Sequence, residues 1–449
     1  MTRRDTADVL VVGAGAAGLA AALFCARMLR GARIVCVDGA KSVGAKILVS
    51  GGGRCNVTNR EVTEQDFWGG DRRFIRNVLR AYPASRATAF FAELGVPLHE
   101  EEGGKFFPDS NSARTVLDAL LRGLKESGAA LELSARVERL ERTEHGFVVL
   151  TRQGITYDAS AVVLATGGRS LPKTGSDGAG YAFARALGHG YIETTPALVP
   201  LVLGPTSRSA PTVDMNPSTP TVHTNPSTPT VHMNPAAAWH AKLSGVAHRV
   251  AVSVRSDGAP PVRLEGAMLW THFGVSGPVI LNASRHWLRA RAERRQAAVL
   301  LHLVPATFTE LERWLQDEQR DHPRALVRNV IATRLPASVA DAWVNASGID
   351  APTTLAHLAR DARRTLIASL LETPLAVIDS RGYNYAEVTA GGIPLGEVDP
   401  ATMESRVCPG LYLIGEILDV DGRIGGFNFQ WAWSSAWVAA NAIAGKLRA

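Results

Sequence analysis

The chain has 449 residues, 46% of them hydrophobic, so it can bury one large core or divide into two to three domains. Its net charge of +6 is spread along the sequence, which favours an ordinary charged surface over a nucleic-acid partner. Four cysteines without a C-x-x-C pair or metal-ligand spacing indicate reduced thiols and no metal site. Composition therefore predicts a globular, cytoplasmic protein.

The first 38 residues follow the pattern of a dinucleotide-binding unit: a strand, a glycine turn, an apolar helix and a second strand. Gly13 permits the tight turn, Gly15 lets the backbone approach a pyrophosphate, and Gly18 allows close packing of helix and strand. Asp38 ends the second strand, where a carboxylate can accept the hydroxyls of an adenosine ribose. The glycines also interrupt the uncharged run 9–26, which argues against a signal peptide or a membrane span.

A second glycine-rich segment, residues 44–59, predicts a loop held against a ligand. Its three consecutive glycines, 51–53, let the backbone lie flat on a planar or anionic group while donors from Ser50 and Arg54 converge on it. Cys55 lies in the same loop. No second cysteine is close in sequence, so packing or cofactor contact is favoured over redox catalysis.

Residues 205–237 differ from everything around them. A nine-residue unit rich in Pro, Thr and Asn is repeated almost unchanged, which predicts a disordered surface insertion. Duplication of this unit explains the repeated His223 and His232 better than a metal site does. Elsewhere, periodicity predicts helices at 71–95, 112–127, 180–187, several within 307–371, and 430–447, with strands in 131–157, 161–165, 243–281, 374–399 and 410–415.

Three strand-end turns, at Gly13, Thr166 and Gly415, call for one explanation. In a doubly wound sheet the carboxyl ends of neighbouring strands meet at one crevice, so these turns can line a single cofactor. A nicotinamide domain needs only the first turn, whereas extended FAD suits all three. The segment 425–431 opens the last helix, whose N-terminal dipole can stabilise negative charge on a reduced flavin.

Four long motifs, at residues 46–59, 165–175, 271–278 and 415–435, resemble a bacterial FAD flavoprotein family of aminoacetone-oxidase-like and bile-acid dehydro-reductase-like NAD(P)/FAD-dependent oxidoreductases. The resemblance implies an α/β fold, in which an FAD-binding Rossmann-like doubly wound domain carries an inserted β-barrel-like domain and a helical subdomain. The implied boundaries are 1–192 and 393–449 for the FAD-binding domain, 193–300 and 372–392 for the inserted β-rich domain, and 301–371 for the helical subdomain.

Carried onto this sequence, the resemblance also implies a set of FAD contacts in four stretches of chain. They are Gly13, Gly15, Ala16, Ala17, Gly18 and Asp38; Lys46, Ser50, Gly51, Gly52, Gly53, Arg54, Cys55 and Asn56; Val137, Ala165, Thr166 and Gly167; and Gly415, Glu416, Asp421, Gly425, Gly426, Phe427 and Asn428. Two features depart from the family pattern: the insertion at 205–237, and Arg423, whose charge lies near the expected flavin.

Because a flavin carries the electron chemistry itself, the sequence names no obligatory catalytic residue. His272 is a candidate proton donor, although a structural role is favoured. Lys46 and Arg54 suit an anionic flavin or a phosphate. The leading expectation is reduction of a conjugated C=C bond in a small organic substrate, with NAD(P)H as a transient co-substrate. The alternatives are an amine or alcohol oxidase or dehydrogenase using O2 or a quinone, and a flavin-containing RNA-modifying or RNA-binding protein.

Overall fold

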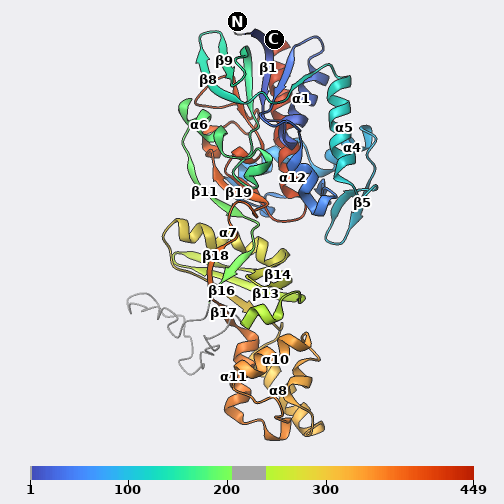
Figure 1. The fold of residues 1–449 in the computed structure, drawn as a ribbon, viewed down its shortest axis with the longest axis vertical. Coiled ribbons are helices and arrows are strands. Elements are labelled where there is room, and N and C mark those ends of the chain that lie inside the picture. The colour runs from blue at the N-terminus through green and yellow to red at the C-terminus, as the bar shows by residue number, and fades with distance from the viewer. Residues whose placement is uncertain (1–2, 205–238, 449) are drawn as a thin grey trace. The chain divides into compact units, whose positions relative to one another are not determined.

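The computed structural model describes residues 3–204 and 239–448, which form two compact units. The first unit comprises Met1–Ala197 and Gly382–Ala449, so both chain ends belong to it (Figure 1); the second is Leu198–Arg381. The predicted disordered insertion at 205–237 lies outside the described residues.

The first unit is built on a seven-stranded sheet in the order β7-β2-β1-β10-β9-β8, with β20 also paired to β10. Strands β7, β2, β1, β10 and β20 run parallel, while β9 and β8 extend the sheet in antiparallel fashion. The central strands are nearly continuous runs of buried Val, Leu and Ile, as expected of parallel strands covered on both faces. Their bounds are β1 Arg4–Val12, β2 Ile34–Val37, β7 Ala130–Glu132, β8 Val137–Thr143, β9 Gly146–Thr151, β10 Thr156–Leu164 and β20 Leu411–Leu413.

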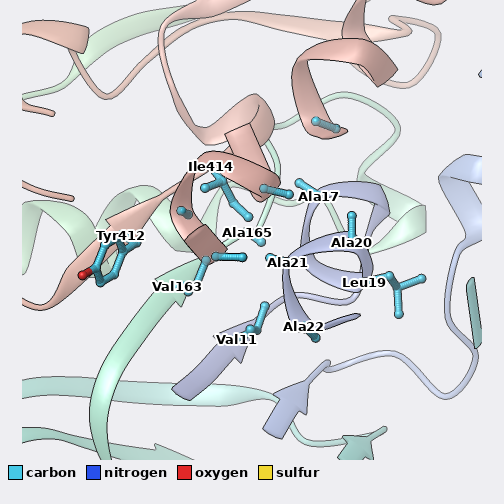
Figure 2. Packing of buried hydrophobic residues seen from close by; sticks show 14 of the residues in the cluster. Val11, Ala17, Leu19, Ala20, Ala21, Ala22, Val163, Ala165, Tyr412 and Ile414 are labelled. Atoms are coloured by element: carbon cyan, nitrogen blue, oxygen red, sulfur yellow. The ribbon is translucent and has the colours of Figure 1, made fainter. Parts of the chain in front are cut away.

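Helix α1 (Ala16–Met28) packs closely on this sheet because its inward side is mostly alanine. Figure 2 shows Ala17, Ala20 and Ala21 of α1 facing residues from the ends of the central strands, among them Ala165 and Ile414. The long C-terminal helix α12 (Phe427–Arg448) packs against α1. The N-terminal and C-terminal segments of the first unit thereby share one hydrophobic core.

The remaining elements of the first unit surround the sheet. The single helix predicted over 71–95 is two helices, α3 and α4, because Pro83 lacks a backbone N–H donor and stands at the N-cap of the second. The elements are α2 Ala45–Val49, β3 Thr58–Asn59, β4 Phe67–Gly69, α3 Arg72–Ala81, α4 Ala84–Glu93, β5 Leu98–Glu101, β6 Lys105–Pro108, α5 Ala113–Glu126, α6 Ala179–Ala186, β11 Ile192–Ala197, β19 Val388–Gly392 and β21 Val420–Gly422.

The second unit is a seven-stranded sheet, in the order β17-β16-β13-β14-β15-β12-β18, together with five α-helices in its described part. Sheet and helices share one hydrophobic cluster, in which Trp270 of the sheet lies 5.9 Å, ring to ring, from Trp343 of α10. The elements are β12 Leu201–Leu203, β13 Ala247–Ser256, β14 Ala259–Thr271, β15 Gly274–Ser276, α7 Pro278–Ala292, β16 Ala297–His302, α8 Phe308–Asp321, α9 Val327–Ile331, α10 Ala337–Ala346, α11 Arg360–Leu371, β17 Thr373–Leu375 and β18 Val377–Ser380.

Two boundaries differ from the division drawn on sequence. Residues 193–197 and 382–392 are assigned there to the inserted domain, but in the structure they cluster with the first unit. The physical reason is the antiparallel pairing of β11 with β19, which holds Ala197 opposite Val388 and Ile192 opposite Gly392.

Candidate functional site

Three parallel strands of the first unit end at glycine-containing turns that the sheet brings together. A Cβ added at Gly13, after β1, would lie 2.6 Å from the carbonyl oxygen of Ala165, after β10. A Cβ added at Gly415, after β20, would lie 2.9 Å from the Cβ of Ala17 in α1. Turns from residues 13, 165 and 415 therefore meet at the carboxyl edge of one sheet, where ligands bind in open α/β folds.

Within the first turn, Gly15 and Gly18 have different surroundings. A Cβ at Gly18 would stand 1.8 Å from the carbonyl oxygen of Gly13, so only glycine lets α1 approach the strand this closely. A Cβ at Gly15 would meet nothing within 4 Å. Open space therefore lies in front of the N-terminus of α1, which begins with Ala16 and Ala17 and presents backbone N–H groups suited to a phosphate.

Asp38 holds the turn and also lines a pocket of about 440 Å³. Its two carboxylate oxygens accept the backbone N–H groups of Ala14 at 2.7 Å and Ala40 at 2.8 Å. Each oxygen keeps a further lone pair, so the carboxylate can still accept ligand hydroxyls. The wall of the pocket includes Gly13, Asp38, Lys41, Arg136, Val137, Thr166, Lys173 and Gly175.

Extended FAD fits these residues on several independent observations. Thr166 lines the pocket, but its hydroxyl is buried against Gly180, where an added Cβ would lie 1.8 Å from the Oγ1 atom. Gly167 adopts a left-handed φ of 71°, and a Cβ there would lie 2.6 Å from the Ser176 hydroxyl. Beside the glycine loop, Val49 is 56% exposed, an apolar surface that a planar ring would cover.

The glycine loop itself follows α2 and has left-handed backbone at three successive residues. Gly51, Gly52 and Gly53 have φ values of 56°, 68° and 84°, and all three are exposed, with Ser50 partly buried before them. Cys55 behind them also has positive φ, at 62°, and is fully buried. Burial raises the pKa of its thiol to about 12, so it stays protonated and is not a redox nucleophile.

The two cations predicted to favour an anionic cofactor are each paired with a carboxylate. Arg54 donates to Glu101 at 2.6 Å and lies 4.0 Å over the ring of Phe107. Lys46 donates to Glu416 at 2.6 Å and to the hydroxyl of Ser170 at a similarly short distance of 2.5 Å. Their positive charge is therefore compensated within the protein.

Glu416 is the centre of a polar network linking the ends of three segments. Its second oxygen accepts the Ser170 hydroxyl at 2.7 Å and the backbone N–H of Thr389 at 2.9 Å. The Thr389 hydroxyl in turn accepts the backbone N–H groups of Arg169 and Ser170. Lys46 and Glu416 are among the contacts expected from the sequence, whereas Ser170, although inside the motif 165–175, and Thr389, outside all four motifs, are not.

The C-terminal contacts surround the start of α12. A Cβ at Gly426 would lie 2.5 Å from the backbone of Thr58, and Gly425 has a φ of 125°. With its amide oxygen turned toward Gly426, Asn56 accepts that residue's N–H at 3.1 Å. The start of the helix, with Phe427 buried in its first turn, is thus seated against the segment that follows the glycine loop.

Asp421 and Asn428 lie in and beside β21. Asp421 is buried and pairs in register with Trp68 of β4, while the Asn428 amide closes a turn by bonding both backbone groups of Gly422. Arg423, the residue that departs from the family pattern, has its positive charge balanced by Asp66. Its guanidinium donates to Asp66 at 2.7 Å and stacks on the ring of Phe427 at 4.0 Å. No net charge is added beside α12 by this pair.

Two further histidines were checked as catalytic candidates, His272 and His189. His272, in the turn between β14 and β15 of the second unit, is exposed and packs edge-on against Phe273, with 5.1 Å between the ring centres. His189 bridges Glu397 and Ser405 at 2.8 Å each, in the order of a hydrolase triad. The Ser405 oxygen, however, is buried and accepts the N–H groups of residues 407 and 408, so this group is a structural brace.

In residues 3–204 and 239–448, no cluster of three or more His, Cys, Asp or Glu side chains is arranged to hold a metal ion. Over the same residues, no helix combines the length and apolar character needed to cross a bilayer.

The sequence matches a known protein family and several characterised relatives. The family model described as HI0933-like protein Rossmann domain matches residues 7–442. The chain is 32% identical to a 3-dehydro-bile acid delta(4,6)-reductase of Clostridium scindens, over 97% of this chain and 98% of that protein. It is 31% identical to a ribosomal RNA dihydrouridine synthase of Escherichia coli, over 96% and 97% respectively, and 30% identical to that of Haemophilus influenzae, over 97% and 98%.

Proposed function

Because the chain belongs to the HI0933-like Rossmann-domain family and is an FAD-dependent oxidoreductase, we propose that it reduces a C=C bond conjugated to a carbonyl group, with NAD(P)H as the electron source. One observation carries the proposal: relatives with very different substrates share this chemistry. A delta(4,6)-reductase of a 3-oxo bile acid saturates double bonds conjugated to a ketone, and a dihydrouridine synthase saturates a ring double bond conjugated to a carbonyl.

The residues that would hold FAD are those gathered at the carboxyl edge of the sheet. Asp38 would accept the ribose hydroxyls, the open side of Gly15 would admit the pyrophosphate, and Thr166 would form part of the pocket wall. Lys46 and Glu416 would border the same groove as a neutral pair. Bound there, FAD supplies two-electron transfer, so the protein itself needs to bind, orient and protonate the substrate.

The distribution of charge favours a second candidate substrate, a uridine within RNA. The first unit carries 29 Lys and Arg against 28 Asp and Glu, whereas residues 239–381 carry 18 against 13. The basic excess is therefore concentrated in the second unit and not spread along the chain. Five of these arginines fall in α7 and the turn after it, residues 285–295, with Glu293 the one acidic residue among them. Of these, Arg291 and Arg294 are exposed, whereas Arg285 is buried and Arg295 pairs with Glu293 at 2.6 Å. The exposed arginines suit a phosphate backbone.

The test is substrate-driven reoxidation of the reduced holoenzyme under anaerobic conditions. After reduction with NADPH or NADH, a 3-oxo-Δ4 steroid and uridine-containing ribosomal RNA are added separately, and the return of oxidised-flavin absorbance is followed. Reoxidation by either compound, with the saturated product identified by mass spectrometry, supports the proposal. Failure of both compounds to reoxidise the flavin contradicts it.

A charge variant separates the two substrates. Arg294, in the turn after α7, is exposed. Arg294→Glu is expected to weaken RNA-driven reoxidation and its salt dependence while leaving the steroid rate unchanged. An RNA rate that is independent of both salt and this substitution would argue against the RNA candidate.

A further inference from the structure

Glu387 directly precedes β19, in a segment fixed at two points to the loop formed by residues 169–171. On one side, the carbonyl of Tyr383 accepts the N–H of Leu171 at 2.8 Å. On the other side, the Thr389 hydroxyl accepts two N–H groups of the loop, at 2.8 and 3.0 Å. Glu387 stands at a bend two residues before Thr389, and its carboxyl lies within the field of Lys46, whose ammonium donates to Ser170 of this loop.

The Glu387 side chain is exposed although its neighbours Ala386 and Val388 are buried. Across the described residues, its carboxyl group has no hydrogen bond and no ion pair. The surrounding protein nevertheless disfavours the charged form, and desolvation raises the pKa of this carboxyl above its usual value. The field of Lys46 opposes that rise, but Lys46 is itself neutralised by Glu416.

The other charged groups near Glu387 already have partners within the protein. Glu416 accepts hydrogen bonds from Lys46, Ser170 and the Thr389 backbone, and the Arg169 guanidinium lies 5.1 Å over the ring of Tyr383. Glu387 is the acidic group beside this network that has both access to solvent and a free carboxyl in the described part of the chain. Accessibility, the lack of a partner and reluctance to ionise are the properties that a general acid needs.

We propose that Glu387 is the catalytic proton donor of this enzyme, an assignment that rests on the C=C reduction proposed above. In the reaction, the carbon β to the substrate carbonyl receives a hydride, with its two electrons, from the reduced FAD. The α carbon receives the carboxyl proton of Glu387, and the C=C π bond becomes two C–H bonds. Water then returns a proton to the Glu387 carboxylate, and NAD(P)H restores the reduced cofactor.

The test compares the two half-reactions of wild-type and Glu387→Gln holoenzymes by stopped flow. FAD content and reduction by NADPH are expected to be unchanged, because neither requires a proton on the substrate. Reoxidation by a 3-oxo-Δ4 steroid or by ribosomal RNA is expected to slow by about 100-fold or more. In the wild type, the reoxidation rate falls as pH rises through the carboxyl pKa, because only the protonated form donates; in Glu387→Gln this dependence is lost.

A second readout does not depend on turnover. Infrared difference spectra of the wild-type protein between low and neutral pH should contain the carbonyl stretch of a carboxylic acid that titrates above the ordinary glutamate range. The Glu387→Gln protein should lack this band. Glu126→Gln, which removes an exposed carboxylate at the end of α5, serves as the matched control and should behave as wild type in every measurement.

The possible failures are distinguishable. If wild-type flavin is reoxidised and Glu387→Gln matches its rate and pH profile, the assignment of Glu387 is overturned. If no enone reoxidises the wild type, the proposed function fails, and absence of the infrared band then also removes Glu387 as a protonated group. Should Glu387→Gln not fold, Glu387→Asp retains a carboxyl and is expected to keep the pH dependence at a reduced rate; a pH-independent rate there would equally overturn the proposal.

Discussion

Replacing Gly15 by aspartate should separate cofactor binding from folding. Gly15 is the N-cap of α1, with φ −74° and ψ −169°, a conformation open to any residue, and a Cβ there meets no atom within 4 Å. Aspartate is a favoured N-cap, and its charge at a helix N-terminus is worth about 0.3–1 kcal/mol. The Gly15→Asp apoprotein should therefore be as stable as the wild type, or up to about 1 kcal/mol more stable.

The same substitution should abolish FAD retention. The new carboxylate would stand in the open space through which a pyrophosphate reaches the α1 N-terminus. Two unit charges about 5 Å apart, at an effective dielectric constant of about 20, repel by about 3 kcal/mol. One such pair weakens binding by more than about 100-fold, and a pyrophosphate carries more than one charge.

The assay measures both quantities on apoprotein. Urea denaturation gives the free energy of unfolding, and quenching of flavin fluorescence on titration with FAD gives the Kd. Gly396→Asp is the control, since a Cβ at Gly396 also meets nothing within 4 Å and this glycine is not among the predicted cofactor contacts. Wild-type FAD affinity in Gly15→Asp would refute the assignment of the pyrophosphate site, and a loss of stability above about 1 kcal/mol would refute the N-cap argument.

Three further predictions concern the same unit. Gly18→Ala places a Cβ 1.8 Å from the Gly13 carbonyl oxygen and should destabilise the protein by about 1–3 kcal/mol or more, measured by urea denaturation. Lys46→Met leaves Glu416 without its cation and should cost about 1–3 kcal/mol, and a double-mutant cycle with Glu416→Gln should recover part of that loss; strict additivity would contradict the pairing. Cys55 should resist alkylation in the native state at pH 8 and react only after unfolding, as mass spectrometry would show.

The fold class was predictable because its signals are local. The glycine turn at residues 13–18, the acid at Asp38 and the buried strand before Thr166 each occupy a few consecutive residues, and the Rossmann-like fold they predict is confirmed. Their spacing follows from backbone sterics and from the burial of parallel strands on both faces. The break at Pro83 was also readable in the sequence, although periodicity alone ran the helix through it.

The polar network was not predictable in full, because its members come from distant parts of the chain. Lys46 and Glu416 are 370 residues apart, and Ser170 and Thr389 join them through hydrogen bonds between segments far apart in the sequence. The pairing of charges is likewise a tertiary property: sequence suggests free cations at residues 46 and 54, whereas the structure gives each a carboxylate. The FAD contacts themselves stay a prediction, now tied to specific tests.

The placement of β20 has a consequence for how the protein matures. This central strand comes from the C-terminal segment and pairs with β10 through Val162–Leu164, some 250 residues earlier in the chain. At about 5–20 residues per second, the ribosome needs at least about 10 seconds to supply the missing partner after β10 is made. During that interval the nascent chain exposes a hydrophobic strand edge and has no complete groove for the flavin. The complete groove for the flavin is therefore available only after β20 has been synthesised, near the end of translation.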